Sequence, residues 1–125
     1  HRKIERNMDD IVLVEEDWKP TDRTVVVSFG ASARAARHAV KLARQHRLKV
    51  GMVSLLTIWP FAEEVIARVA RTAKRIIVPE MNLGQIALEV ERIACRQKVI
   101  RVNRANGEMV TPEMILDAIE GHEYA

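Results

Sequence analysis

The stretch RIIVPEMNLGQIALEVERIA, residues 75–94, changes its hydrophobic pattern in the middle. Its first residues form a short apolar run that stops at Pro79, as expected for a buried β-strand. From Leu83 to Ala94 apolar residues recur every three or four positions, which predicts an amphipathic helix with Asn82 as its cap. The stretch therefore predicts a strand, a turn and a helix, the repeating unit of a parallel α/β sheet.

The same alternation runs along the rest of the chain. Further apolar, β-branched runs predict strands at Thr24–Phe29, Val50–Leu55 and Val99–Val102, with an edge strand at Ile11–Val14. Helical spacing predicts helices at Ser32–Gln45, Pro60–Ala73 and from Thr111 to about Ile119, before Gly121. We therefore expect an α/β three-layer sandwich, in which a mostly parallel sheet of about five strands has helices on both faces.

The length of 125 residues is that of one domain. We expect residues 1–23 to be a linker with the edge strand, and residues 24–125 to be the α/β domain. Because the chain begins at His1 rather than Met, we also expect it to be part of a longer polypeptide.

Composition narrows the class of protein. A hydrophobic fraction of 48% with 30% charged residues is typical of a soluble globular domain, and a net charge of +3 is too weak to indicate nucleic acid. The only cysteine, Cys95, lies in a helical pattern where it would be a small apolar residue; it fits a reducing, cytoplasmic compartment. No apolar stretch approaches the ~20 residues that cross a bilayer, so no membrane partner is expected.

Four loops follow the carboxyl ends of the predicted parallel strands, where ligands and partners of open α/β sheets gather. They are residues 30–32, 57–61, 80–85 and 103–107. Gly30 and Ser32 could begin a phosphate-binding helix terminus, but a dinucleotide fingerprint needs three glycines. A tight turn with Ser32 capping the helix is the favoured interpretation.

Two of these loops have two open interpretations each. In EMNLGQ, Glu80 is either solvated or presented to a partner, with Asn82 capping a helix in both cases. In TIWPF, Phe61 fits the buried face of its helix, whereas Trp59 is either an interface anchor or part of the core.

Candidate catalytic and metal-binding residues are few. His38 and His46 lie on the polar side of a basic helix, with no further ligands at metal-binding spacing. Ser32 lacks the flanking glycines of a nucleophile elbow. The stripe Arg34, Arg37, Lys41 and Arg44 has no interleaved aromatics, so a solvated helix face is favoured over nucleic-acid binding. The sequence thus predicts no catalytic residue and no metal site in this chain.

The segments VVVSFGASARAARHAV, VSLLTIWPF, IIVPEMNLGQIALEVER and NGEMVTPEMI resemble, in sequence and order, a known family. This family is the carboxy-terminal, transketolase-like domain of the α subunit of 2-oxoacid:ferredoxin oxidoreductases, most like the 2-oxoglutarate type. The likeness runs from about Ile4 to Ile119, and TIWPF together with EMNLGQ is its specific part.

The resemblance implies a complex that oxidatively decarboxylates a 2-oxoacid, forms acyl-coenzyme A and reduces ferredoxin. Thiamine diphosphate with Mg, an iron–sulfur cluster and coenzyme A would be held elsewhere in that complex, and no cofactor by this chain. The domain would be a non-catalytic assembly part, inactive alone, that docks onto the other α-subunit domains and the β subunit. Its interface candidates are Gly30, Ser32, Trp59, Pro60, Glu80, Asn82 and Gln85. The alternative is a free-standing module that binds a nucleotide or coenzyme A.

Overall fold

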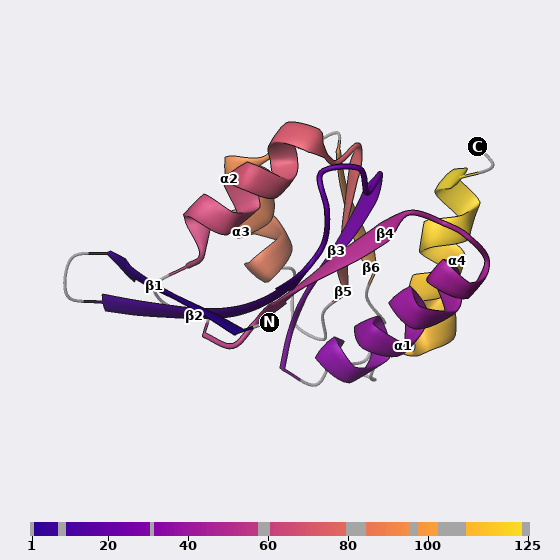
Figure 1. Cartoon of the computed structure of the whole chain (residues 1–125), viewed down its shortest axis with the longest axis horizontal. Coiled ribbons are helices and arrows are strands. Elements are labelled where there is room, and N and C mark those ends of the chain that lie inside the picture. The colour runs from indigo at the N-terminus through magenta and orange to yellow at the C-terminus, as the bar shows by residue number, and fades with distance from the viewer. Residues whose placement is uncertain are drawn as a thin grey trace.

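The protein is an α/β sandwich built on one six-stranded sheet (Figure 1). The computed structural model describes residues 2–7, 10–30, 32–57, 61–79, 85–95, 98–102 and 110–123, with only the backbone for residues 2–7, 10–12 and 122–123. The strands are β1 (Arg2–Asn7), β2 (Asp10–Asp17), β3 (Thr24–Phe29), β4 (Val50–Leu55), β5 (Arg75–Pro79) and β6 (Val99–Val102). Their order across the sheet is β1-β2-β4-β3-β5-β6.

The sheet has a parallel part and an antiparallel part. β4, β3, β5 and β6 pair in parallel, with Thr24 opposite both Val50 and Arg75. β2 runs antiparallel to β4, and β1 antiparallel to β2. Parallel pairing places the carboxyl ends of β3 to β6 at one edge of the sheet, the carboxyl edge, and their starts at the opposite, amino edge.

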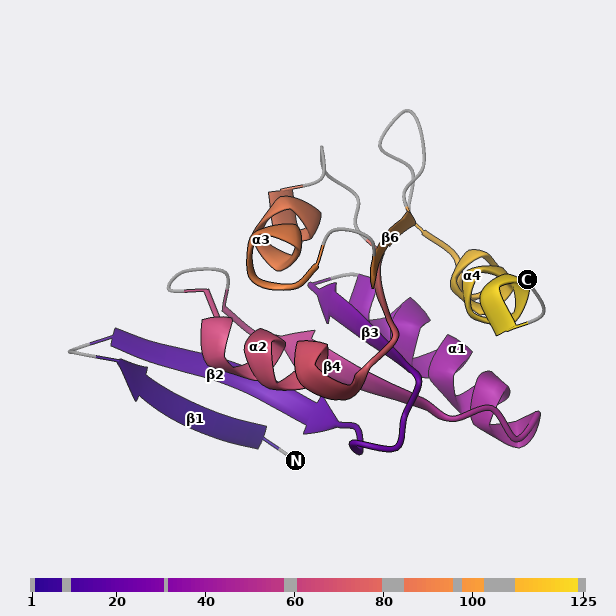
Figure 2. The same cartoon turned by 90° about the horizontal axis from the view of Figure 1, so that it is seen from above.

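Helices cover both faces of the parallel part. α1 (Ser32–Gln45) and α4 (Pro112–Glu123) lie together on one face, and α2 (Glu63–Thr72) and α3 (Gln85–Ile93) on the other (Figures 1 and 2). β3 supplies side chains to both layers: Val25 and Val27 pack in the α2–α3 core, whereas Val26 packs in the α1–α4 core. A strand covered on both faces must be apolar at successive positions, which explains the near-continuous valine run.

The four expected parallel strands are confirmed, and β5 extends one residue further to Pro79. The expected edge strand differs from the structure. Ile11–Val14 lies within β2, the second strand, because Arg2–Asn7 pairs outside it as β1. Arg2–Asn7 carries charged residues at most positions, so hydrophobic periodicity gave no signal for a strand there.

Two helix boundaries among the described residues differ from expectation by more than one residue. α2 begins at Glu63 rather than Pro60, which lies outside the described residues; Ala62 precedes the helix without a side-chain cap. α4 begins as expected, with the Met114 amide donating to Thr111 Oγ1 at 3.3 Å. It then passes through Gly121 to Glu123, because a lone glycine weakens a helix by only ~1 kcal/mol and need not end it.

The described part of α3 runs from Gln85 to Ile93 and buries Ile86, Ala87 and Val90, the face that the spacing predicts. Cys95 lies beyond the end of α3 and is exposed, so its expected place as a small apolar residue of the helix was wrong. No helix among the described residues has the length and hydropathy to cross a membrane.

Candidate docking site at the carboxyl edge of the sheet

The candidate site lies where the parallel strands end, at Phe29, Leu55, Pro79 and Val102. Three of the seven predicted interface residues are described by the structure: Gly30, Ser32 and Gln85. Trp59, Pro60, Glu80 and Asn82, like the loop at residues 103–107, lie outside the described residues, so their role stays a prediction.

Gly30 and Ser32 form the turn between β3 and α1. Gly30 is exposed and adopts a φ of 62°, a left-handed conformation that favours glycine, and its carbonyl accepts the Ala33 amide at 3.0 Å. Ser32 is buried, and its hydroxyl donates to the Phe29 carbonyl at 2.8 Å while accepting the Phe29 amide at 3.3 Å. Ser32 is therefore the first helical residue, tied back to the strand, and does not cap the amides ahead of it as expected.

The bonding of Ser32 bears on the nucleotide alternative. A phosphate at this helix start would be bound by backbone amides without help from the Ser32 hydroxyl, because that hydroxyl is bonded to Phe29. Gly30 and Ser32 also do not line the grooves described next. The tight-turn interpretation thus describes this loop better than a phosphate cradle.

Gln85 opens the described part of α3 and is exposed, as a docking residue must be. Phe61 is only 6% exposed and packs in the α2–α3 core, which confirms its predicted burial, although it precedes α2 rather than lying on the helix. The loop after β4 thus combines a buried anchor at Phe61 with Trp59, which comes two residues earlier.

A contact that the sequence gave no means of finding ties this edge to the amino-terminal hairpin. The Leu56 amide donates to the Leu13 carbonyl at 3.0 Å, and the Leu13 amide donates to Thr57 Oγ1 at 3.3 Å. β2 is antiparallel to β4, so the beginning of β2 lies beyond the carboxyl end of β4. The hairpin and the loop after β4 therefore meet at the candidate site.

Three consecutive carboxylates of β2 meet arginines on alternate faces of the sheet. Arg37 of α1 lies 3.9 Å from Glu15, Arg68 of α2 lies 3.2 Å from Glu16, and Arg44 of α1 lies 2.9 Å from Asp17. The Trp18 indole also donates to Glu16 at 3.0 Å. Glu15, Asp17, Arg37 and Met52 line a groove between β2 and α1, so part of the basic stripe of α1 faces carboxylates rather than open solvent.

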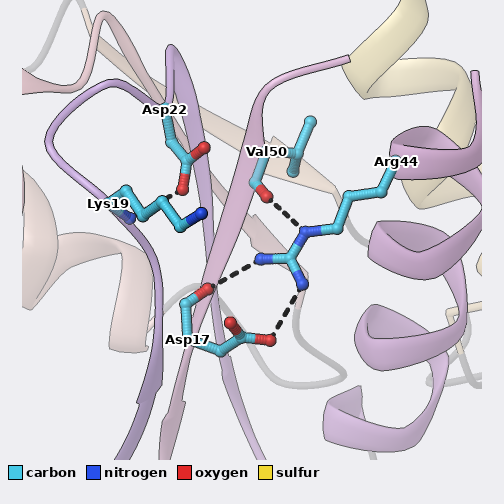
Figure 3. Close-up of polar contacts among 5 residues, drawn as sticks. All are labelled: Asp17, Lys19, Asp22, Arg44 and Val50. Carbon is cyan, nitrogen blue, oxygen red and sulfur yellow. Dashed lines mark hydrogen bonds and ion pairs between the residues drawn. The ribbon is translucent and has the colours of Figure 1, made fainter. Parts of the chain in front are cut away.

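The amino edge is closed by polar contacts around Arg44 (Figure 3). The Arg44 guanidinium donates to the Asp17 carboxylate at 2.9 Å, the Asp17 carbonyl at 3.0 Å and the Val50 carbonyl at 2.9 Å. The hydrogen bond from Arg44 is the main reason that the pKa of Asp17 lies below its ordinary value of 3.8. Beside it, Asp22 accepts the Lys19 amide at 2.7 Å.

The residues of this chain do not fit an iron–sulfur cluster. One cysteine cannot supply the thiolate set of an iron–sulfur cluster. Among the described residues no three His, Cys, Asp or Glu side chains are placed to share a metal ion. No step of a reaction is therefore assigned to this chain.

Comparison with known families decides the identity. The family model for pyruvate:ferredoxin oxidoreductase core domain II matches residues 23–115. The chain belongs to this family. It is also 38% identical to 2-oxoglutarate synthase subunit KorA of Methanocaldococcus jannaschii, over 95% of this chain and 32% of the relative. This domain II chain therefore spans about a third of the length of that relative.

Solved structures support the fold. The 2-oxoglutarate:ferredoxin oxidoreductase of Magnetococcus marinus, solved with 2-oxoglutarate, coenzyme A and succinyl-CoA, matches with a TM-score of 0.77 at 24% identity, covering 86% of this chain and 19% of that one. A split-gene transketolase, an inactive β4 tetramer, matches with a TM-score of 0.70 at 17% identity, covering 83% and 39%. The resemblance predicted from the sequence and the transketolase-like fold are both confirmed.

Proposed function

We propose that this domain II is a non-catalytic assembly domain in the α subunit of a thiamine diphosphate-dependent 2-oxoacid:ferredoxin oxidoreductase. The complete enzyme would decarboxylate a 2-oxoacid, join the acyl group to coenzyme A and pass two electrons to ferredoxin. The observation that carries the proposal is the likeness to KorA, which extends over 95% of this chain. The relative is named for 2-oxoglutarate and the family for pyruvate, so these are the two substrates to test first.

The docking surface in this proposal is the carboxyl edge, with Gly30, Ser32, Trp59, Pro60, Glu80, Asn82 and Gln85. Gly30 and Gln85 are exposed and follow strands that end at the same edge. Ser32 is buried, so its part would be to fix the turn that presents Gly30. The partners would be the other α-subunit domains and the β subunit, which hold thiamine diphosphate with Mg, the iron–sulfur cluster and coenzyme A.

The α/β unit in this proposal begins at residue 24, after a linker and hairpin. The family match supports this division because it begins at residue 23. The pairing of β2 with β4 adds that the segment before residue 24 shares the sheet rather than hanging free of it.

The activity test uses the complete α subunit with its β subunit, supplied with thiamine diphosphate, Mg and coenzyme A. Reduction of a viologen dye is followed with 2-oxoglutarate and with pyruvate. We expect reduction that depends on both coenzyme A and one of these 2-oxoacids. If a well-folded complex reduces the dye with none of 2-oxoglutarate, pyruvate and a branched-chain 2-oxoacid, the proposed activity is refuted.

The docking role is tested separately on the same complex with Trp59→Ala, Glu80→Ala and Gln85→Ala. The matched control is Arg71→Ala, an exposed residue in the last turn of α2, which lies away from the carboxyl edge. We expect weaker association of the subunits, or lower turnover at unchanged thermal stability, for the edge variants only. Full assembly and turnover in all three would refute the docking role while leaving the activity in place.

A further inference from the structure

The β1–β2 hairpin projects past the sheet to which it belongs. β2 pairs with β4 only through Val14–Asp17, whereas its first half, Asp10–Leu13, has no strand partner other than β1 among the described residues. The hairpin extends as a two-stranded ribbon away from the helices (Figures 1 and 2). A two-stranded ribbon is at best marginally stable in water, so this one needs further contacts to persist.

The contacts of Leu13 fix which backbone groups of β1 face outward. Both the amide and the carbonyl of Leu13 bond on the β4 side, to Thr57 and Leu56. Leu13 is opposite Ile4. In an antiparallel pair, the backbone groups of two opposite residues either both point toward the other strand or both point away from it. Leu13 and Ile4 are therefore a non-hydrogen-bonded pair, and the amide and carbonyl of Ile4 point away from β2.

The same alternation applies along β1. The backbone groups of Arg2, Ile4 and Arg6 face the outer edge, whereas those of Lys3, Glu5 and Asn7 face β2. β1 is the terminal strand of the sheet, so this outer row has no strand partner among the described residues. Such a row is a template onto which another strand can pair.

We propose that the outer edge of β1 binds an additional strand from the polypeptide that precedes this domain in the same α subunit. This inference rests on the proposed function and on the carboxy-terminal place in the α subunit that the resemblance implies, since it requires polypeptide ahead of this domain; the relative KorA is about three times as long as this chain. Strands consecutive in sequence pair about two-thirds of the time, and a tethered segment has a high effective concentration at the edge.

Charge selects the chemistry of the added strand. β1 carries Arg2, Lys3 and Arg6 against a single carboxylate, Glu5. Pairing two copies of β1 edge to edge would set this excess positive charge against itself, which disfavours a dimer through this edge. An extended segment rich in Asp and Glu is the complementary partner.

The strand would also bear on the candidate docking site. The ribbon meets the loop after β4 at Leu13 and Thr57, next to the segment that carries Trp59. An added strand would hold the ribbon, and with it this loop, against the neighbouring domains. The proposal thus names the surface by which domain II is attached within its own subunit.

The test is residue-resolved hydrogen exchange in the complete α subunit, at a concentration where it is a monomer. A free edge would show alternation, with the inward amides of Lys3 and Glu5 slow and the outward amides of Ile4 and Arg6 fast. We expect all four to be slow, with Ile4 and Arg6 exchanging at least about tenfold more slowly than an unprotected amide. Fast exchange at Ile4 and Arg6 would overturn the proposal. The basic residues of β1 would then serve to prevent aggregation through an unpaired edge.

A pair of variants supplies the control. Ile4→Pro removes the outward amide without removing a bond to β2, whereas Ile4→Val keeps that amide. We expect Ile4→Pro to release the protection of Arg6 and Ile4→Val to retain it, with Glu5 slow in both. Equal protection of the Arg6 amide in both variants would contradict an added strand. Protection that appears only when the β subunit is present, or only in a dimer, would contradict pairing within the α subunit.

The outcome can be separated from that of the activity test. Slow exchange at Ile4 in a subunit whose complex reduces no dye would refute the enzyme function but keep the pairing. Fast exchange at Ile4 in an active complex would refute the strand pairing but keep the enzyme function.

Discussion

The two edges of the sheet hold their residues in different ways. At the amino edge, one arginine side chain and several backbone bonds join β2, β3, β4 and α1: Arg44 makes three hydrogen bonds, and the Arg23 amide donates to the Lys49 carbonyl at 3.1 Å. At the carboxyl edge, the described contacts include the bonds of Ser32 with Phe29 and those of Leu13 with Leu56 and Thr57. The described bonds of the amino edge thus tie a helix side chain to two strands, whereas those of the carboxyl edge lie beside the loops that carry the proposed docking residues.

The largest effect is expected where the amino edge is packed most closely. A Cβ on Gly51 would collide with the Trp18 Cβ and lie 2.6 Å from Asp22 Oδ2 and 2.7 Å from the Trp18 Cα. Because a backbone atom is among the neighbours, Gly51→Ala should lower the free energy of unfolding by about 2–3 kcal/mol, measured by urea denaturation.

Gly121→Ala is the matched control for that substitution. Nothing lies within 4 Å of the Cβ position on Gly121, and the residue is helical. This variant should gain up to ~1 kcal/mol, because alanine is the better helix former. A loss equal to that of Gly51→Ala would show that close packing against Trp18 is not the cause.

The next effect comes from Arg44. Arg44→Met should lower the free energy of unfolding by roughly 1 kcal/mol, mainly because the hydrogen bonds to the Asp17 and Val50 carbonyls are lost. The ion pair with Asp17 adds little to this loss because it is well exposed. Arg37→Met should change the free energy of unfolding by less than about 0.5 kcal/mol, since Arg37 is 61% exposed and 3.9 Å from Glu15. Equal losses in the two variants would remove the distinction between an anchoring and a solvated arginine.

A smaller effect depends on pH. The pKa of Asp17 is depressed in the folded protein, so its contribution to stability is present above pH 3.8 and is lost as pH falls through the folded-state pKa. Asp17→Asn should therefore destabilise by a few tenths of a kcal/mol at pH 7, and this difference should shrink as the pH falls through the folded-state pKa. A difference that grows in acid would have the wrong sign for this mechanism.

The smallest effect on stability is expected at the carboxyl edge. Gln85→Ala should change the free energy of unfolding by less than about 0.5 kcal/mol, because Gln85 is exposed. Its effect should instead appear in subunit association. A clear loss of stability with normal association would reverse the roles that the comparison gives to the two edges.

Much of the parallel sheet could be predicted because burial on both faces leaves a direct signal in sequence. Val25 to Val27 are apolar at successive positions since both helix layers need them, and the Thr111–Pro112 start of α4 carries its own capping chemistry. β1 left no such signal, because charged residues occupy most of its positions and interrupt any apolar pattern. The prediction that Ser32 caps α1 was wrong because its hydroxyl instead forms hydrogen bonds with the backbone of Phe29.

The sequence by itself determined the parallel strands, the helix faces and the family, since these follow from local periodicity and from short motifs. Only the tertiary structure decided that residues 2–7 and 10–17 join the sheet, that Glu15, Glu16 and Asp17 meet arginines from two helix layers, and that Leu13 lies beside Thr57. The contacts of Leu13 and of the three carboxylates join residues 22 to 52 positions apart. Their pairing depends on strand order and register, which no local pattern encodes.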